Sequence, residues 1–466
     1  MSVRLYGGVR LLGQGPCLKN IEVLDRNSWP MVQFMAKTGM QVDLTHFATM
    51  EQALTQDMSA ITDYVRDMAG HHVNLDSSDQ VAALLFQELG LKQAHPKMTD
   101  SGARESVEDE VLTAIQHDHP VVPKILEYKE FSKLRGTYVR PMPKLARRVS
   151  HGEWRMFPNF STTRVPSGRF ACKEPNLLAM PTRTERGRDI RRGFITQDGW
   201  IYCSIDMSQI EVRAAAHCSR DPNLIRVYEN EEDVYSDFAT TAFNLPDERH
   251  KTEAGKWEYP TIDKLDHRRP SKTCVLASIY DVSAGGLLEQ LPIICANCHL
   301  DAIKHTCKKF TPLWTEDKAQ GLINSFYRQY PGILRDREVH HKRAMRFGYV
   351  WDVWGRILHV AAVRSVHQWV VSAALREAGN FPYQALACGL LKLCMAKTMA
   401  DIEDGGMLDL VHFLLPLHDE LILECREDLA DDVIGLVAYN FETCAPLRVP
   451  IKASGGKAPN WGDLEH

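Results

Sequence analysis

Two short acidic sites follow apolar runs in this sequence. Asp206 ends the run WIYCSI, and Asp419 with Glu420 interrupts the run LVHFLLPLHDELILEC. Hard cations such as Mg²⁺ prefer oxygen ligands and need few protein groups, so two such carboxylates on adjacent strand ends would suit a pair of Mg²⁺ ions in phosphoryl transfer. Two ordinary strand-end aspartates, bonded to backbone N–H groups, explain the same residues, and these residues alone favour that interpretation.

A second segment, HRRPSKTCVLASIYDVSAGGL, places four side chains at helical spacing. Arg268, Lys272, Leu276 and Tyr280 occur at i, i+4, i+8 and i+12, which puts them on one stripe of a helix. Pro270 has to lie in the first turn, where the helix dipole also favours phosphate. The stripe would suit a nucleotide with its triphosphate at the cationic end. A solvated basic helix start that leads into the core remains the alternative.

The elements that must position these residues follow from the apolar patterning. Residues 20–150 show helical spacing, whereas 154–187 is rich in Pro and Gly and predicts extended or looped chain. A buried strand is expected to end near Asp206, with a helix from about Gln209. The run around His418 and Asp419 predicts a hairpin with these residues at its tip, preceded by a long helix around Gln384–Ile402.

Length and composition bound the class of protein. The 466 residues exceed what one core normally supports, so at least two packed units are expected. With 44% apolar and 25% charged residues, a disordered, collagenous or membrane class is excluded. No signal peptide or spanning segment is apparent, which predicts a cytoplasmic protein without a targeting signal, and the 12 cysteines are expected to be mostly reduced.

The net charge of −5 conceals a basic stretch. Residues 124–192 contain 17 Lys plus Arg against 6 Asp plus Glu, a local net charge of +11. Such a stretch inside an acidic chain indicates a groove for a polyanion. A charged solvent face, balanced by acidic neighbours in space, would look the same in the sequence.

These segments together resemble one family. Asp206-Met207-Ser208-Gln209-Ile210-Glu211, Arg268-Arg269-Pro270-Ser271-Lys272 with Tyr280, and His418-Asp419-Glu420 resemble motifs A, B and C of the family A DNA polymerases, the DNA polymerase I type. Ser167-Gly168-Arg169-Phe170, the spacing of Arg376, Asn380, Pro382 and Gln384, and the final PLRVP and PNW are also similar. The resemblance covers roughly residues 25–466.

The resemblance implies an α+β right-hand polymerase with an antiparallel-sheet palm and mainly helical thumb and fingers. We expect an N-terminal extension at 1–20, the thumb at 21–150, the palm at 151–215 and again at 375–466, and the fingers at 216–374. The stretch before the thumb is too short for the 3′–5′ exonuclease domain of the family, so none is expected. This compact form with unusual motif B residues suggests a phage-like polymerase, acting in the host cytoplasm if phage-encoded.

The resemblance also implies roles for individual residues. Two Mg²⁺ ions would be held by Asp206, Asp419 and the Met207 carbonyl, with Glu420 close to the primer end. Arg268 and Lys272 would hold the triphosphate, and Lys272 is the candidate proton donor to the leaving pyrophosphate. Glu211 matches the family's steric gate against a ribose 2′-hydroxyl. The further nucleotide-site residues are Gln209, Leu276, Tyr280, Tyr235 and Arg183, and the residues expected to contact the primer–template duplex are Arg169, Arg376, Asn380, Gln384 and His418.

The sequence departs from the family in motif B and in the fingers. The family's Asn-Phe-Gly is Val275-Leu276-Ala277 here, and Asp281 replaces the Gly after Tyr280. Leu276 stands where the family has an aromatic residue against the incoming sugar, so sugar discrimination is expected to differ. Tyr235 aligns with the usual fingers His, which would weaken one phosphate contact.

An apparent insertion between Leu291 and Thr315 contains a cluster of soft ligands. Cys295, Cys298, His305 and Cys307 supply four candidate ligands for a structural Zn²⁺. The spacing is not that of a standard zinc finger, and helical fingers often bury cysteines, so core cysteines are the competing interpretation.

Three functions are compared on this basis. The first is a template-directed DNA polymerase that uses primer–template DNA and dNTPs. This function predicts a monomer that does not bind a membrane, with a primase or helicase as possible partners. The second is a polymerase with relaxed sugar or template choice, such as a single-subunit RNA polymerase or reverse transcriptase. The third is an inactive nucleic-acid-binding homologue, which would not need the Asp206 and Asp419 pair.

Overall fold

The centre of the fold is a four-stranded antiparallel sheet. The computed structural model describes residues 3–4, 6–11, 15–92, 98, 105–149, 152–182, 184–253, 257–260, 262, 267–292 and 313–464. The strand order is β13-β14-β8-β15. The strands are β8 (Trp200–Met207), β13 (Val411–Leu417), β14 (Glu420–Arg426) and β15 (Ala453–Ala458).

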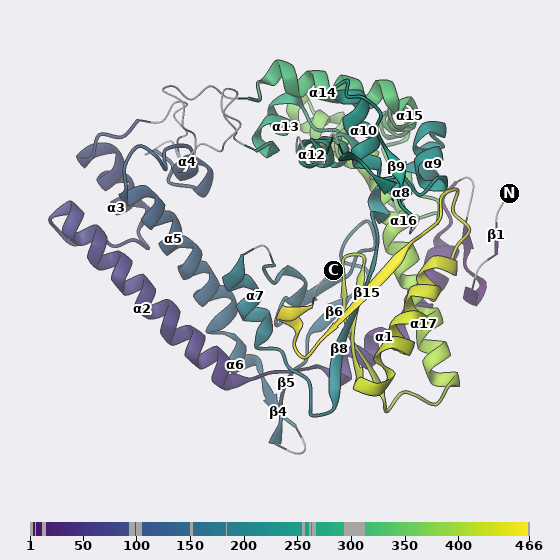
Figure 1. Ribbon diagram of the computed structural model, residues 1–466, viewed down its shortest axis with the longest axis horizontal. Coiled ribbons are helices and arrows are strands. Elements are labelled where there is room, and N and C mark those ends of the chain that lie inside the picture. The colour runs from purple at the N-terminus through teal and green to yellow at the C-terminus, as the bar shows by residue number, and fades with distance from the viewer. Residues whose placement is uncertain are drawn as a thin grey trace.

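The sheet is apolar because three helices cover it. Helices α1 (Leu18–Thr38), α16 (Gln368–Asp404) and α17 (Ala430–Thr443) lie beside β8 and β15 in Figure 1, and α1 packs against β13 while α17 packs against β8 and β15. Burial explains why β13 and β14 read as nearly continuous apolar runs rather than as alternating ones. The predicted strand at Asp206 and the predicted hairpin at His418–Asp419 are therefore confirmed.

A helical group on one side of the sheet is built from residues 44–145. Asp43 caps α2, since its carboxylate accepts from the N–H groups of Thr45 and His46, and Gly70 ends the helix at φ +75°. Helix α5 packs along α2. The helices of this group are α2 (Leu44–Ala69), α3 (Ser78–Ala82), Ala83–Glu88, α4 (Asp109–Ala114), α5 (Val121–Lys133), Leu134–Val139 and α6 (Met142–Leu145).

A second helical group is built mainly from residues 210–347. Side chains cap several of its helices, including Asp233 on α10 and Thr315 on α14. Helix α12 starts at Arg268 with Pro270 in its first turn, as the sequence predicted. The helices are α8 (Ile210–Ser219), α9 (Pro222–Glu229), α10 (Val234–Ala242), α12 (Arg268–Ile279), α13 (Ala284–Gln290), α14 (Glu316–Gln329) and α15 (Pro331–Phe347).

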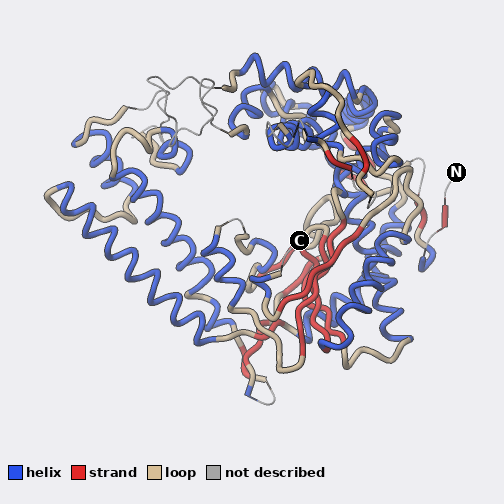
Figure 2. The backbone as a smooth tube through the Cα atoms, viewed as in Figure 1, coloured by secondary structure: helices blue, strands red, loops and turns tan. Residues whose placement is uncertain are grey.

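In Figure 1 the first helical group lies at the left, the second lies at the top, and the sheet lies below the second group. Figure 2 shows the strands gathered at the centre and the helices around them, an α+β arrangement as expected. The remaining short elements are α7 (Glu185–Arg192), β1 (Val3–Arg4), β2 (Arg10–Leu11), β3 (Met40–Gln41), β4 (Arg147–Arg148), β5 (Trp154–Met156), β6 (Asn159–Ser161), β7 (Ala171–Lys173), β9 (His250–Lys251), β10 (Trp257–Glu258), β11 (Tyr349–Trp351) and β12 (Ile357–His359), with single turns of helix at Tyr6–Gly8, Leu177–Ala179, Ala361–Arg364, Glu427–Leu429 and Trp461–Asp463.

Helix α1 belongs structurally with the sheet rather than with α2. It packs against α16, where the fully buried Lys392 ammonium lies 2.6 Å from Asp25 Oδ1 and the Arg356 guanidinium lies 2.9 Å from the same oxygen. A buried ammonium without this carboxylate would be strongly unfavourable. The range 21–150 expected for the thumb includes α1, so we propose that the thumb begins instead at α2.

No helix in the described part of the chain is both long enough and apolar enough to cross a membrane.

Candidate active site

The sheet register brings the two candidate metal-binding aspartates together. Asp206 lies near the end of β8 and pairs with Glu420 on β14, while Asp419 lies in the two-residue turn that joins β13 to β14. The Met207 N–H donates to the Asp419 carbonyl oxygen at 3.3 Å. His418, in the same turn, has a φ of +58°. Two segments more than 200 residues apart therefore meet at one end of the sheet.

The electrostatics of this pair suit a divalent cation. Burial and, next in size, the nearby Asp206 carboxylate raise the pKa of Asp419 to about 7, with Glu211 contributing in the same direction. The two carboxylates repel each other when both are ionised, and a bound cation would relieve that repulsion. In the described residues no group of three or more His, Cys, Asp or Glu could hold a metal. The donors would therefore be two carboxylates and a carbonyl, a set that Mg²⁺ completes with water and substrate phosphates.

Glu420 is buried beneath the pair. The Ser204 hydroxyl on β8 donates to Glu420 Oε1. The negative charge of Glu420 also attracts the positive charge of the buried Arg191. Arg191 is itself held by the Met180 carbonyl at 2.9 Å and lies over the Trp461 ring. Glu420 therefore has a fixed position within the sheet.

A hydrogen-bonded cluster joins α8, α12 and α16 next to the aspartates. Arg169 donates to Glu211 Oε1 at 2.7 Å, and the Tyr280 hydroxyl bonds to Glu211 and to Gln384. Burial and the Glu211 charge raise the pKa of Tyr280. Asn380 Nδ2 donates to the Tyr280 carbonyl at 3.2 Å. The structure thus brings together five of the residues that the sequence singled out, and it holds Glu211 in place from two sides.

Helix α12 presents the predicted stripe. Arg268 and Lys272 are exposed and Leu276 and Tyr280 are half-buried, whereas Ser271, Cys274, Val275 and Ser278 between them are buried. The Arg268 guanidinium makes two bonds to Asp233, at 2.9 and 3.0 Å, and lies 5.2 Å from the centroid of the buried Tyr235 ring. Lys272 Nζ lies 5.8 Å from the same centroid. Both cations therefore lie near the Tyr235 ring. Burial raises the pKa of Tyr235 to about 12.

The other predicted contacts occupy one face of α16 and the adjacent turns. Arg376, Asn380 and Gln384 are one helical turn apart, with Arg376 exposed and the other two half-buried, and His418 is exposed. Gln209 accepts a bond from the Tyr228 hydroxyl at 3.0 Å at the start of α8. Gly168, before Arg169, has a φ of +82°, and a Cβ there would lie 2.6 Å from the Arg356 guanidinium carbon. Only glycine fits this turn, which sets the direction of Arg169.

Two sets of predicted residues lie outside the described residues. Arg183 is one of them, and the candidate zinc ligands Cys295, Cys298, His305 and Cys307 are the others. Their predicted roles stay predictions.

Comparison with known proteins decides the family. The model of the family described as "DNA polymerase family A" matches residues 44–463. The chain belongs to this family. This family A chain is 32% identical over 463 residues to the thermostable DNA polymerase I of Thermus aquaticus. The matched region covers 99% of this chain and 50% of that protein. DNA polymerase I of Deinococcus radiodurans is 29% identical over 431 residues, covering 92% of this chain and 41% of that protein.

A solved structure agrees with the fold of the family A chain. The POL domain of Pol1 from M. smegmatis, in complex with DNA primer–template and dNTP, superposes with a TM-score of 0.79 at 26% identity, covering 96% of this chain and 73% of that one. The family A chain spans about half the length of the curated relatives it matches.

Sequence reasoning missed several partners of the site. Asp233, which pairs with Arg268, and Ser204, which bonds to Glu420, carry no local pattern that would identify them. Arg337 is also new: from α15 it donates to the Ser278 carbonyl at 2.6 Å and to Asp281 Oδ1 at 2.7 Å. Asp281 has a φ of +59°, a conformation that glycine adopts without strain. The family's glycine is thus replaced by a strained aspartate that gains an ion pair with a buried arginine.

Proposed function

We propose that this chain is a template-directed DNA polymerase that adds dNTPs to a primer 3′-hydroxyl. The observation that carries the proposal is the meeting of the Asp206 and Asp419 pair with the α12 stripe and the Glu211 cluster at one end of the palm sheet. A nucleic-acid-binding homologue would have no use for two mutually repelling carboxylates. We propose the palm as the sheet with its covering helices, the fingers as α9–α15, and the thumb as α2–α6.

The residues divide the work of phosphoryl transfer. Mg²⁺ held by Asp206, Asp419 and the Met207 carbonyl would stabilise the attacking and leaving oxygens of an in-line displacement. Arg268 and Lys272 bind the triphosphate and offset the charge that develops on it, and Lys272 donates a proton toward the leaving pyrophosphate. Glu211 and Tyr280 border the sugar. Arg169, Arg376, Asn380, Gln384 and His418 contact the duplex.

In the structure the Arg268 guanidinium is bonded to Asp233, which it exchanges for phosphate oxygens when a nucleotide binds. Asp233 holds this guanidinium in two bonds, through Nε and Nη2, so triphosphate oxygens that take both of these donors displace a carboxylate rather than water. Asp233 also caps α10, and this keeps the carboxylate close by in either state. Arg268 is therefore pre-positioned over Tyr235 before a nucleotide arrives.

Primer extension tests the proposal. A labelled primer–template is incubated with Mg²⁺ and either dNTPs or rNTPs, with the wild-type chain and with Asp419→Ala. Template-dependent extension with dNTPs that disappears in the variant supports a DNA polymerase. Equal extension with rNTPs would instead support the second candidate, a polymerase with relaxed sugar choice. Retained duplex binding without extension on either substrate would favour the inactive homologue.

Leu276 leads to a prediction about the sugar. A leucine cannot donate or accept a hydrogen bond, so the site has no polar group there that would replace interactions of a missing 3′-hydroxyl. We expect dideoxynucleotides to be used roughly 100-fold less efficiently than deoxynucleotides. Competition between the two at one template position, read as the ratio of terminated to extended primer, measures this. Near-equal use would contradict the prediction.

Glu211 leads to a second prediction. Glu211→Ala removes the side chain that Arg169 and Tyr280 hold beside the sugar, and we expect ribonucleotide use relative to deoxynucleotide use to rise roughly 10- to 100-fold. Single-nucleotide kcat/KM values for matched dNTP and rNTP measure the change. Glu211→Gln is the control: it preserves the volume, so discrimination that collapses equally in Glu211→Gln would attribute the effect to charge and contradict a steric gate.

The raised pKa of Asp419 predicts a pH dependence. Below a pH of about 7 this carboxyl is protonated in the free protein and cannot serve as an anionic ligand, so at low Mg²⁺ incorporation should rise with pH through that value. Saturating Mg²⁺ favours the ionised form and should move the midpoint to lower pH. Rate profiles from pH 5.5 to pH 9 at two Mg²⁺ concentrations, about 20-fold apart, test this. If the midpoint pH of the rate profile is the same at both Mg²⁺ concentrations, the result would argue against Asp419 as a Mg²⁺ ligand.

Several predictions from the sequence remain predictions. These are the cytoplasmic location, the monomeric state, the phage-like origin, and partners such as a primase or helicase.

A further inference from the structure

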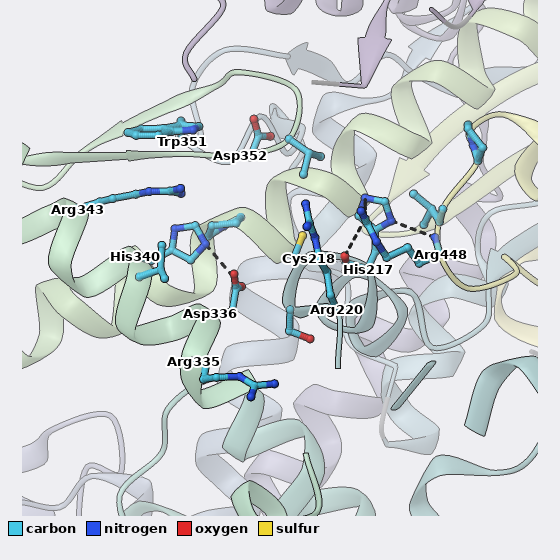
Figure 3. A pocket seen from close by; sticks show the side chains of 16 residues that line it. His217, Cys218, Arg220, Arg335, Asp336, His340, Arg343, Trp351, Asp352 and Arg448 are labelled. Carbon is cyan, nitrogen blue, oxygen red and sulfur yellow. Dashed lines mark hydrogen bonds and ion pairs between the residues drawn. The ribbon is translucent and has the colours of Figure 1, made fainter. Parts of the chain in front are cut away.

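A cavity of about 540 Å³ lies at the far end of α8 from Glu211. Figure 3 shows its walls: the end of α8 and Arg220 on one side, α15 below, Trp351 of β11 with Asp352 on another side, and Arg448 across from them. Because Glu211 is in the first turn of α8 and the cavity begins at His217 in the last turn, the cavity is separate from the catalytic cluster.

The cavity is lined by more positive than negative charge. Four guanidinium groups line it, against two carboxylates. Asp336 accepts from the Tyr383 hydroxyl at 2.9 Å, and Asp352 Oδ1 accepts from two backbone N–H groups at 2.8 and 3.0 Å. Asp352 Oδ2 is buried and has no hydrogen-bond partner among the described residues. The four arginines are Arg220, Arg335, Arg343 and Arg448.

Of the four guanidiniums, Arg343 has a nearby opposite charge, since the Asp336 carboxylate acts to raise its pKa. Within the described ranges, none of the four forms an ion pair with a carboxylate. Arg343 instead lies 4.3 Å above the Trp351 ring, and Arg448 donates to the His217 carbonyl at 3.2 Å. Burial lowers the pKa of both Arg343 and Arg448, and Arg220 lowers that of Arg448 further. The partial burial of Arg343 and the repulsion between Arg220 and Arg448 both disfavour the charged forms, which an anion would relieve.

The histidines of the wall add hydrogen-bonding capacity. His340 is 5% exposed, and its Nδ1 has no hydrogen-bond partner among the described residues, although buried ring nitrogens normally have one. His217 accepts from the Arg448 N–H at 3.1 Å, and burial with Arg448 and Arg220 lowers its pKa to about 4. His217 is therefore neutral and does not add to the repulsion.

We infer that this cavity binds a phosphorylated small molecule of nucleotide size, at a site distinct from the catalytic one. Arginine recognises phosphate with two parallel bonds, and four such groups line this cavity, none of them in an ion pair with a described carboxylate. The volume falls within the range of small-ligand pockets, which run from about 300 to 1,000 Å³. A nucleic acid strand would need a continuous groove, whereas these walls come from segments that meet around one hollow.

Calorimetric titration tests this inference on the full chain. The background variant Arg268→Ala/Lys272→Ala removes the proposed triphosphate contacts of the active site, and EDTA removes divalent cations. Tripolyphosphate and ATP are the probes. We expect one binding site per chain, weakened about tenfold or more by Arg343→Gln/Arg448→Gln. Arg346→Gln, on the same helix but outside the cavity, is the matched control and should leave the affinity unchanged.

Further variants and probes distinguish a loss of binding from a loss of folding, and a small-molecule ligand from a nucleic acid. If Arg343→Gln/Arg448→Gln lowers the unfolding temperature, the exposed pair Arg220→Gln/Arg335→Gln replaces it, because these side chains are exposed. Absence of binding, or equal binding by cavity and control variants, overturns the inference. Binding of a single-stranded oligonucleotide that depends on these arginines, without binding of tripolyphosphate or ATP, overturns the assignment to a small molecule.

Discussion

Replacing either Asp206 or Asp419 with asparagine is expected to slow nucleotide incorporation about 1000-fold while leaving primer–template affinity within about threefold. The amide keeps the shape of the side chain but removes the charge that a Mg²⁺ ion needs. The proposed duplex contacts come from other elements, such as the face of α16 that bears Arg376. The loss should therefore fall on the chemical step and not on DNA binding.

Single-turnover quench measurements with a preformed enzyme–DNA complex, together with an independent DNA-binding titration, separate the two quantities. Asp431→Asn is the control, since Asp431 is an exposed carboxylate on α17 and, among the described residues, is paired with Lys457 at the surface. Removing one charge from the repelling pair should leave the unfolding temperature in EDTA equal or higher. Incorporation within tenfold of wild type in Asp206→Asn would contradict the metal role.

Lys272→Ala is expected to lower kcat/KM for dNTPs by roughly 100- to 1000-fold. Lys272 is exposed on the α12 stripe one turn from Arg268 and stands over Tyr235, where an ammonium would meet the triphosphate. Its charge is needed most when negative charge moves onto the leaving pyrophosphate, so kcat should fall as well as affinity.

Arg269→Ala provides the matched control for this change. Arg269 is also an exposed cation on α12, but it lies about 100° round the helix from Arg268, off the stripe. Pre-steady-state titrations with dNTP give the affinity and the maximal rate separately for both variants. Equal losses in Arg269→Ala and Lys272→Ala would show that overall positive charge matters rather than a specific contact, and the assignment of Lys272 would fail.

The elements of the site could be predicted from the sequence because local signals specify them. The apolar run before Asp206 ends where β8 ends, and the run interrupted at His418 and Asp419 forms the β13–β14 hairpin. Pro270 marks the first turn of α12, and four-residue spacing places its stripe. The resemblance of ordered motifs then gave the roles, and the family match is confirmed.

The pairings around the site could not be predicted in this way. Asp233 and Arg268 are 35 residues apart, and Asp25 and Lys392 are 367 apart. Such contacts depend on how whole helices pack, which periodicity within one segment does not encode. The place of α1 against α16 was missed for the same reason, since an amphipathic helix shows which face is buried but not what covers it.

The ion pair between Asp281 and Arg337 restricts the paths by which this sequence could have diverged. Restoring glycine at 281 would relieve the left-handed strain but leave the buried guanidinium of Arg337 without its carboxylate. Losing the arginine first would leave the strain uncompensated and would remove the Arg337 donor from the Ser278 and Ile279 carbonyls. Each single change passes through a less stable protein, so the two positions are epistatic and would be exchanged together rather than one at a time.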